Sequence, residues 1–269
     1  MILSADYAQL LALLAAAAYL LAAVPVPSER RWPVQALVAA WVLQGAMLVA
    51  GAGVWGPHEA GLRIGFAPVL SFTIWLVLAV HGIESRFVPI AGLRRALAVS
   101  GALAVTLAFL FPGELRAVAH SRWAPLHWVL GISSYGLVAV AVLHALMLDA
   151  AERQMRQKKQ KGPSTALGMP LLKLEKLTFR FVEAGFVVLT LALALGLGSS
   201  YWHWDHKTIL SMMGWVTLAA LLVGRLWRGW RGRQATRWLY AGAVLLLLAY
   251  VGSRFVLEVL LQRGGAGAV

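Results

Sequence analysis

The sequence predicts an all-α fold: a polytopic transmembrane helix bundle of about eight spans, with both termini on the external, periplasmic side. Three observations lead to this prediction. The 269 residues are 60% hydrophobic and only 13% charged, whereas soluble domains are about 45–50% apolar and about 25% charged. The apolar residues gather in segments of roughly 20, which is the length that crosses a bilayer. Finally, Lys and Arg are concentrated in alternate loops between these segments.

Eight apolar segments follow one another along the chain, and the fourth is the shortest. No Lys or Arg precedes the first segment. A secretory signal would have a basic start and a shorter apolar core, so we expect the first segment to be a retained span. The predicted spans are Tyr7–Val24, Val34–Gly53, Phe66–Gly82, Ala96–Phe111, Leu126–Leu148, Phe181–Gly198, Thr208–Gly224 and Trp238–Leu260.

The distribution of positive charge predicts which loops are cytoplasmic. The net charge of +13 would suggest nucleic-acid binding in a soluble protein. Here 18 of the 24 basic residues lie in the loops at 25–33, 83–95, 149–180 and 225–237. By the positive-inside rule these loops face the cytoplasm. We therefore expect a multi-pass protein of the bacterial inner (cytoplasmic) membrane, whose partner is the lipid bilayer and not nucleic acid.

Residues 1–269 are expected to form a single transmembrane domain with two notable loops. The loop at 150–180 is basic, and its second half has leucines at helical spacing, which predicts a short amphipathic helix on the inner leaflet. A solvated linker is the alternative. Glu175 and Glu183 are expected to pair with Lys176 and Arg180, and Arg254 with Glu258 one turn later in the last span. The second loop, 198–208, is expected to be external.

Histidine is the main candidate for ligand chemistry, because the chain has seven His and no Cys. Without Cys, disulfides and thiol chemistry are excluded. His127 and His144 are 17 residues apart on one predicted helix, about 25 Å, so they cannot share a metal ion. His203 and His206 could share a zinc ion but could hardly bind opposite faces of one haem iron. A haem with two His ligands would therefore need two different segments.

The external loop 198–208 is the most unusual stretch of the chain. Tyr201, Trp202 and Trp204 lie beside the two imidazoles of His203 and His206. The aromatic rings offer a flat stacking surface with possible iron ligands next to it. Asp205 could orient an imidazole or pair with Lys207. The alternative for the whole loop is an aromatic belt at the membrane surface.

The run Tyr201-Trp202-x-Trp204-Asp205-x-Lys207-Thr208, followed by Trp215, resembles the WWD signature of the cytochrome c assembly superfamily, which includes the CcsA, CcmC, CcmF and HemX proteins. Further runs within 170–179, 206–211, 229–233 and 249–258 are similar to the YpjD/HemX branch. The resemblance covers roughly residues 66–260.

The resemblance implies a protein that presents non-covalently bound haem b on its external Trp-rich loop. His127, in Leu126-His127-Trp128, resembles the family's external His before that loop. Two positions depart from the family: His206 stands where Pro is usual, and the last external His has no counterpart here. Therefore His206 or His203 would have to replace that ligand. The implied haem-contacting residues are His127, His206, His203, Tyr201, Trp202, Trp204 and Asp205, with His127 and His206 as iron ligands.

Three functions remain open from the sequence. The first is a haem-binding protein that relays haem to other membrane proteins of cytochrome maturation and is not itself an enzyme. The second is an accessory or regulatory membrane protein that kept the fold but does not deliver haem, which the missing His favours. A secondary transporter is the weakest, because the sequence has no paired broken helices or inverted repeat.

Overall fold

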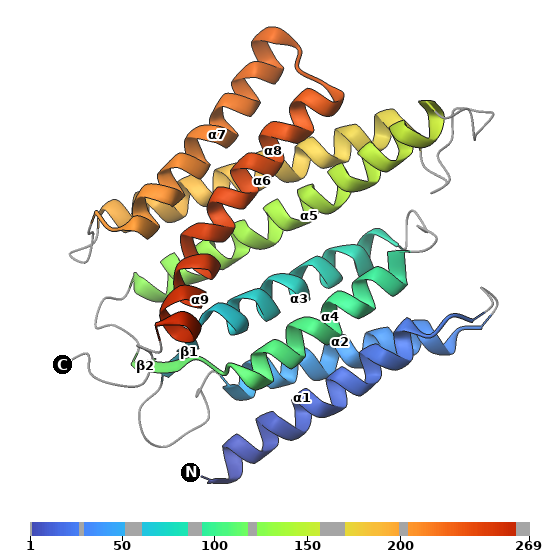
Figure 1. Cartoon of the computed structure of the whole chain (residues 1–269), viewed down its shortest axis with the longest axis vertical. Coiled ribbons are helices and arrows are strands. Elements are labelled where there is room, and N and C mark those ends of the chain that lie inside the picture. The colour runs from blue at the N-terminus through green and yellow to red at the C-terminus, as the bar shows by residue number, and fades with distance from the viewer. Residues whose placement is uncertain are drawn as a thin grey trace. The chain divides into compact units, whose positions relative to one another are not determined.

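The computed structural model describes residues 2–26, 30–51, 61–85, 93–117, 123–156, 170–198 and 204–261. These residues are almost entirely helical, so the predicted helical bundle is confirmed (Figure 1). The helices are α1 Ile2–Ala23, α2 Trp32–Gly51, α3 Phe66–Glu84, α4 Leu93–Leu110, α5 Ala124–Arg156, α6 Leu171–Leu197, α7 His206–Arg228, α8 Gly232–Leu247 and α9 Ser253–Phe255, with π-helical segments at Leu248–Gly252 and Val256–Leu260.

Seven helices among the described residues are long and apolar enough to cross a membrane. They correspond to the second to eighth predicted spans, and the last one runs through α8, α9 and both π-helical segments, Gly232–Leu260. The first predicted span coincides with α1, whose apolar stretch Tyr7–Ala23 is shorter. The predicted number of spans is therefore close to the number of long helices.

The sequence missed a pair of short strands. Strand β1, Gly61–Ile64, precedes α3, and strand β2, Glu114–Ala117, follows α4. They pair antiparallel, with Gly61 opposite Ala117 and Ile64 opposite Glu114. Strands of four residues are too short to show a clear alternation of apolar and polar residues, so the sequence pattern did not reveal them.

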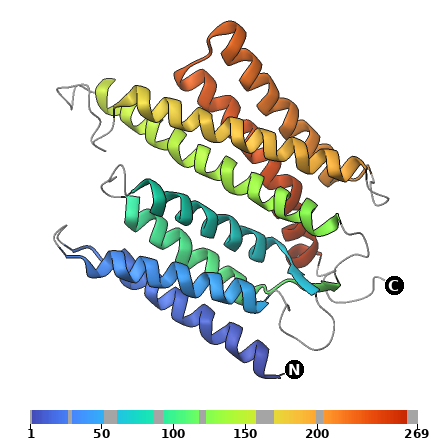
Figure 2. The ribbon, with the colours of Figure 1, turned by 180° about the vertical axis from the view of Figure 1, so that it is seen from behind.

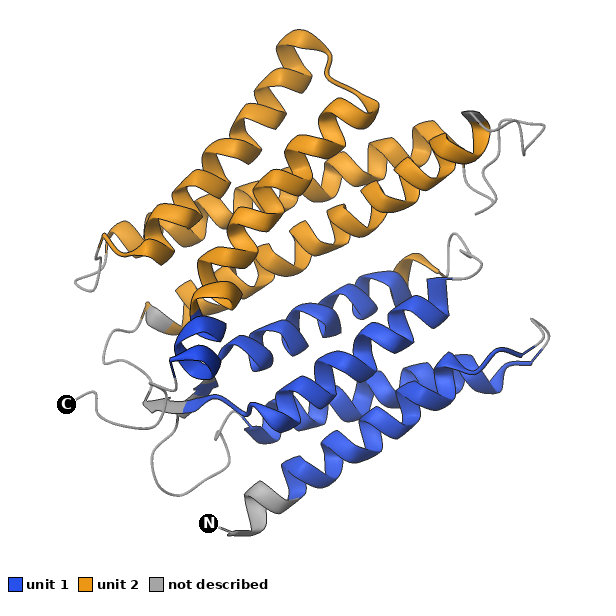
Figure 3. Cartoon of the chain, viewed as in Figure 1, with its two compact units in different colours: residues 1–82, 91–121, 254–269 blue, residues 83–90, 122–253 orange. Residues whose placement is uncertain are grey.

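The chain divides into two compact units (Figure 3). Unit 1 comprises residues 1–82, 91–121 and 254–269, and unit 2 comprises 83–90 and 122–253. The single transmembrane domain expected for residues 1–269 stays a prediction. The stretch at 171–181, expected as a separate amphipathic helix, forms the first turns of α6. The rest of that loop, 157–169, lies outside the described residues.

Unit 1 is held together by a buried polar contact between α1, α2 and α3. The Tyr19 hydroxyl donates to Gln44 Oε1, and Gln44 Nε2 donates to the Ser71 carbonyl and hydroxyl at 3.0 and 2.9 Å. Gly101 of α4 lies against the Tyr19 ring, where an added Cβ would come within 2.6 Å of ring atoms. Each buried polar group in this contact is thus satisfied inside the bundle, as an apolar solvent requires.

Unit 2 has a core formed by the facing sides of α5, α6, α7 and α8. Figures 1 and 2 show α5 and α6 running side by side in opposite directions, and α7 and α8 forming a hairpin. Gly229 ends α7 in the left-handed conformation, φ 65°, which Gly adopts without strain. The core side chains include Val138, Phe179, Val182, Leu189, Leu218, Leu221, Leu239 and Leu246. This packing places the start of α5, the end of α6 and the start of α7 at one end of the unit.

Candidate functional site

His127 lies in the first turn of α5 and is half-buried. Its Nδ1 atom is 2.9 Å from the carbonyl oxygen of Ala192 in α6. A carbonyl oxygen only accepts, so Nδ1 carries the proton of this hydrogen bond. In the neutral imidazole, the Nε2 atom then has its lone pair free. Histidines that bind metals are usually fixed in this way, with the other ring nitrogen donating to a carbonyl or carboxylate.

His206 and Asp205 lie at the start of α7, at the same end of unit 2 as His127. Asp205 is the N-cap residue, and its Oδ1 accepts from the Thr208 backbone N–H at 2.9 Å. Partial burial opposes ionisation of this carboxyl, but hydrogen bonds from Thr208 and the nearby charges of Lys207 and His206 lower its pKa below the usual value. Asp205 thus begins the helix, and His206 is the exposed first residue of that helix.

Trp204 precedes the cap and is 71% exposed. It borders a shallow groove of about 350 Å³ that runs along one face of α7. Known ligand pockets range from about 300 to 1,000 Å³. The remaining lining is apolar except for one hydroxyl: Ile209, Met212, Met213, Val216 and Thr217. An aromatic side chain therefore opens onto an apolar surface directly beside His206.

Trp215 lies on a different face of α7 and packs against α6. Its indole Nε1 donates to the Thr190 hydroxyl at 2.9 Å, and its ring stacks on Phe186 at 5.4 Å between centroids. Its role in the structure is thus helix packing. The remaining predicted site residues, Tyr201, Trp202 and His203, lie outside the described residues.

The donors that the structure describes at this end of unit 2 are the imidazoles of His127 and His206, which fit the needs of a haem iron. Within the part of the chain that the structure describes, no three His, Cys, Asp or Glu side chains are grouped as metal ligands. A zinc site needs three or four protein ligands, whereas haem iron needs one or two axial ligands. His127 offers an oriented nitrogen, and Trp204 with the α7 groove offers apolar area.

The structure adds Tyr135, whose role the sequence did not reveal. Its hydroxyl donates to the Leu246 carbonyl of α8 at 2.9 Å. The π-helical segment Leu248–Gly252 begins two residues later. In a π-helix the backbone N–H groups bond to carbonyls five residues back instead of four. The Tyr135 hydroxyl donates to a carbonyl just before this change. The partner lies 111 residues away, so no local pattern could have identified it.

His144 lies 17 residues after His127 on α5 and is fully buried. Its Nδ1 atom hydrogen-bonds the Val140 carbonyl at 2.8 Å, and its Nε2 is 3.2 Å from Glu84 Oε2. The ring also stacks on Phe181. Nδ1 is therefore satisfied inside unit 2, whereas Nε2 lies close to the Glu84 carboxylate without a hydrogen bond among the described residues.

Comparison with known proteins identifies the family. Residues 64–261 match the family described as cytochrome c assembly protein. The chain belongs to this family. The match begins at the end of β1 and runs through every element of unit 2, so it includes both His127 and the start of α7.

Individual relatives of this family agree with that result. The inner membrane protein YpjD of Escherichia coli is 34% identical over 167 residues, which is 58% of this chain and 60% of YpjD. An uncharacterized 28.8 kDa protein of Azospirillum brasilense is 30% identical over 79% of this chain and 83% of its own length. The cytochrome c biogenesis protein CcsA of Prochlorococcus marinus is 25% identical over 70% of each chain. No solved structure matches.

The match to YpjD spans 60% of that protein's length. The chain is a member of this family and has seven long apolar helices among its described residues. It is a multi-pass protein of the bacterial inner membrane.

Proposed function

We propose that this cytochrome c assembly family protein binds haem b non-covalently at the end of unit 2 where α5 and α7 begin. His127 is the first iron ligand, and His206 or His203 is the second. The haem ring lies on Trp204, Tyr201 and Trp202 of the loop at 198–208. The protein holds and relays haem to other membrane proteins of cytochrome maturation, and itself makes or breaks no covalent bond.

The observation that carries this proposal is the hydrogen bond from His127 Nδ1 to the Ala192 carbonyl. The bond fixes the ring and keeps the Nε2 lone pair available for iron. Haem would supply the macrocycle and its iron, and the chain would supply the ligand nitrogen and the apolar surface at Trp204.

We further propose that this end of unit 2 faces the periplasm. The opposite end carries eight basic residues and one acidic residue within 171–180 and 225–237. By the positive-inside rule such an end faces the cytoplasm, which would leave the haem-binding end outside. Haem held there would be accessible to a protein that receives it on the periplasmic side.

The test is the absorption spectrum of the purified full-length protein in detergent, before and after adding haemin. We expect a Soret band that shifts on binding, and we expect His127→Ala to reduce haemin affinity at least tenfold. Added imidazole should restore the band in His127→Ala, because it can occupy the vacated ligand position. Rescue by imidazole separates the loss of a ligand from a general loss of structure.

His144→Ala is the matched control, because His144 lies on the same helix and its Nδ1 also bonds a carbonyl. It should keep the Soret band of the unaltered protein. A well-folded, colourless protein that leaves the Soret band of added haemin unshifted would overturn the proposal. That outcome would favour the accessory or regulatory function, which the missing last external His also favours.

A further inference from the structure

The other end of unit 2 carries a dense cluster of positive charge. The start of α6, the last turn of α7, the turn that follows it and the start of α8 contain eight basic residues against one acidic residue, Glu175, within 171–180 and 225–237. Most of these arginines and lysines are exposed. The cluster comprises Lys173, Lys176, Arg180, Arg225, Arg228, Arg231, Arg233 and Arg237.

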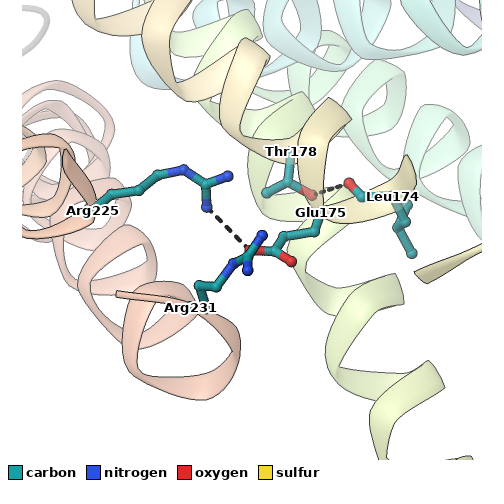
Figure 4. A network of polar contacts seen from close by, with 5 residues as sticks. All are labelled: Leu174, Glu175, Thr178, Arg225 and Arg231. Atoms are coloured by element: carbon teal, nitrogen blue, oxygen red, sulfur yellow. Dashed lines mark hydrogen bonds and ion pairs between the residues drawn. The ribbon is translucent and has the colours of Figure 1, made fainter. Parts of the chain in front are cut away.

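Glu175 organises two of these arginines. Its Oε1 atom accepts from Arg225 Nη1 and from Arg231 Nε, both at 3.2 Å. Figure 4 shows the two guanidinium groups converging on this carboxylate from α7 and from the residue that precedes α8. The Glu175 side chain is only 12% exposed. The carboxylate therefore links α6 to the α7–α8 turn and neutralises only one of the two positive charges.

The two arginines differ in what they can still bind. Arg225 also lies over the Phe179 ring, 3.5 Å from its centroid, and its side chain is 24% exposed. Arg231 is 66% exposed and contacts Glu175 through Nε. The guanidinium is a rigid fork of N–H donors, so fixing Arg231 at Nε leaves its Nη groups oriented for a second anion. A phosphate is the anion that such a fork binds best, through two parallel hydrogen bonds.

Large apolar side chains lie among these charges. Leu226 and Trp227 are 80% and 85% exposed, next to Arg225 and Arg228. Helix α7 has 23 residues, about 34 Å of helix against a hydrocarbon core of about 30 Å. Its last turn therefore lies near the depth of the lipid headgroups. Exposed Trp and Leu beside Arg are typical of segments that rest at this boundary.

We propose that Glu175, Arg225 and Arg231 form a binding site for the phosphate headgroup of an anionic phospholipid, with Leu226 and Trp227 contacting its acyl chains. The site is distinct from the proposed haem-binding end, and its existence does not depend on haem. The exposed Leu and Trp favour a lipid over free phosphate or an acidic protein, because neither of those has acyl chains to place beside them.

The site differs from a general attraction between basic residues and anionic lipid in one testable respect. General attraction depends on net charge, at about 1 kcal/mol for each basic residue near the surface. Glu175→Gln raises the net charge by one, so general attraction predicts about fivefold tighter binding. A site that depends on the carboxylate to orient Arg231 predicts at least about threefold weaker binding.

The experiment uses full-length protein in detergent, titrated with phosphatidylglycerol and followed by native mass spectrometry of lipid-bound protein. We expect Glu175→Gln to weaken binding. Arg231→Gln should weaken it about tenfold or more, because charge-assisted hydrogen bonds are lost. Arg231→Lys keeps the charge but loses the fork, and it should also weaken binding severalfold. Phosphatidylcholine should bind weakly to every variant.

Arg153→Gln is the matched control. Arg153 is an exposed arginine of α5, and among the described residues the ion-pair partners of Glu175 are Arg225 and Arg231. Arg153→Gln should change binding less than twofold. Equal weakening by Arg153→Gln and Arg231→Gln, or tighter binding by Glu175→Gln, would overturn the proposal in favour of general attraction. Displacement of the lipid by inorganic phosphate or by polyglutamate would overturn it in favour of a free anion or an acidic partner.

Discussion

Two groups of three charges in this protein have opposite composition. In unit 1, Arg254 lies 3.9 Å from Glu114 and 3.9 Å from Glu258. In unit 2, Glu175 lies 3.2 Å from Arg225 and 3.2 Å from Arg231. One group is a cation between two acids, and the other is an acid between two cations.

The two groups also differ in burial. The Arg254 side chain is 8% exposed, and it belongs to the last membrane-spanning helix. Arg231 is 66% exposed at the end of unit 2. A buried charge has to be balanced by its neighbours because water cannot solvate it. An exposed excess charge can instead be balanced by an anion from outside. The Arg254 group is therefore structural, whereas the Glu175 group has an exposed positive charge that can bind a ligand.

The largest effect is expected at Arg254. Arg254→Met removes the cation that pairs with both Glu114 and Glu258. Removing one partner of a buried ion pair costs about 3–5 kcal/mol, because the other charge is left buried and unpaired. We expect a clear drop in the thermal unfolding temperature of the detergent-solubilised protein. Arg254→Met with Glu258→Gln should recover part of the loss, since one carboxylate is then neutral.

Arg237→Met is the control for this prediction. It replaces an exposed arginine of α8 and should change stability by less than about 0.5 kcal/mol. Equal unfolding temperatures for Arg254→Met and Arg237→Met would show that the Arg254 group is not structural.

An intermediate effect is expected at Glu175. Glu175→Gln should lower stability by about 1–2 kcal/mol, because its hydrogen bonds to charged groups are partly exposed. In double-mutant cycles measured by thermal unfolding, the coupling of Glu175 to the less exposed Arg225 should exceed its coupling to Arg231. A larger coupling to Arg231 would contradict the view that Arg231 is the arginine left available to a ligand.

The smallest effect is expected at Asp205. Within the described part of the chain, its negative charge is stabilised by hydrogen bonds from Thr208 and not by a guanidinium group. Asp205→Ala removes the N-cap of α7 and should cost about 1 kcal/mol. The pKa of Asp205 is lowered in the folded state. Its charge therefore stabilises the fold above the unfolded pKa, near about 4, and this contribution is lost as the pH falls through the folded pKa.

Asp205→Asn is the control for that titration, because Asn also caps helices but carries no charge. The difference in unfolding temperature between the unaltered protein and Asp205→Asn should shrink as the pH is lowered from 6 to 3. A difference that stays constant with pH would mean that the ionised carboxylate contributes nothing beyond its hydrogen-bonding oxygen.

Some contacts follow from local spacing and others do not. The pairing of Arg254 with Glu258 was predicted, since the two residues are one helical turn apart, and it is confirmed. For Glu175 the sequence predicted Lys176 and Arg180 as partners. In the structure this carboxylate forms ion pairs with Arg225 and Arg231. Glu114, which also faces Arg254, lies on a strand that the sequence did not reveal.

The helical membrane fold, the approximate position of each span and the family could all be predicted from the sequence. Hydrophobicity over roughly 20 residues and a tryptophan-rich run are properties of local segments, which need no knowledge of packing. The sequence also indicated His127 as a candidate ligand. Three contacts became visible only in the packed structure: the Ala192 carbonyl orients His127, Trp215 packs on α6, and two distant arginines share Glu175. These contacts join helices whose relative rotation and depth depend on packing, which no periodicity within a single helix specifies.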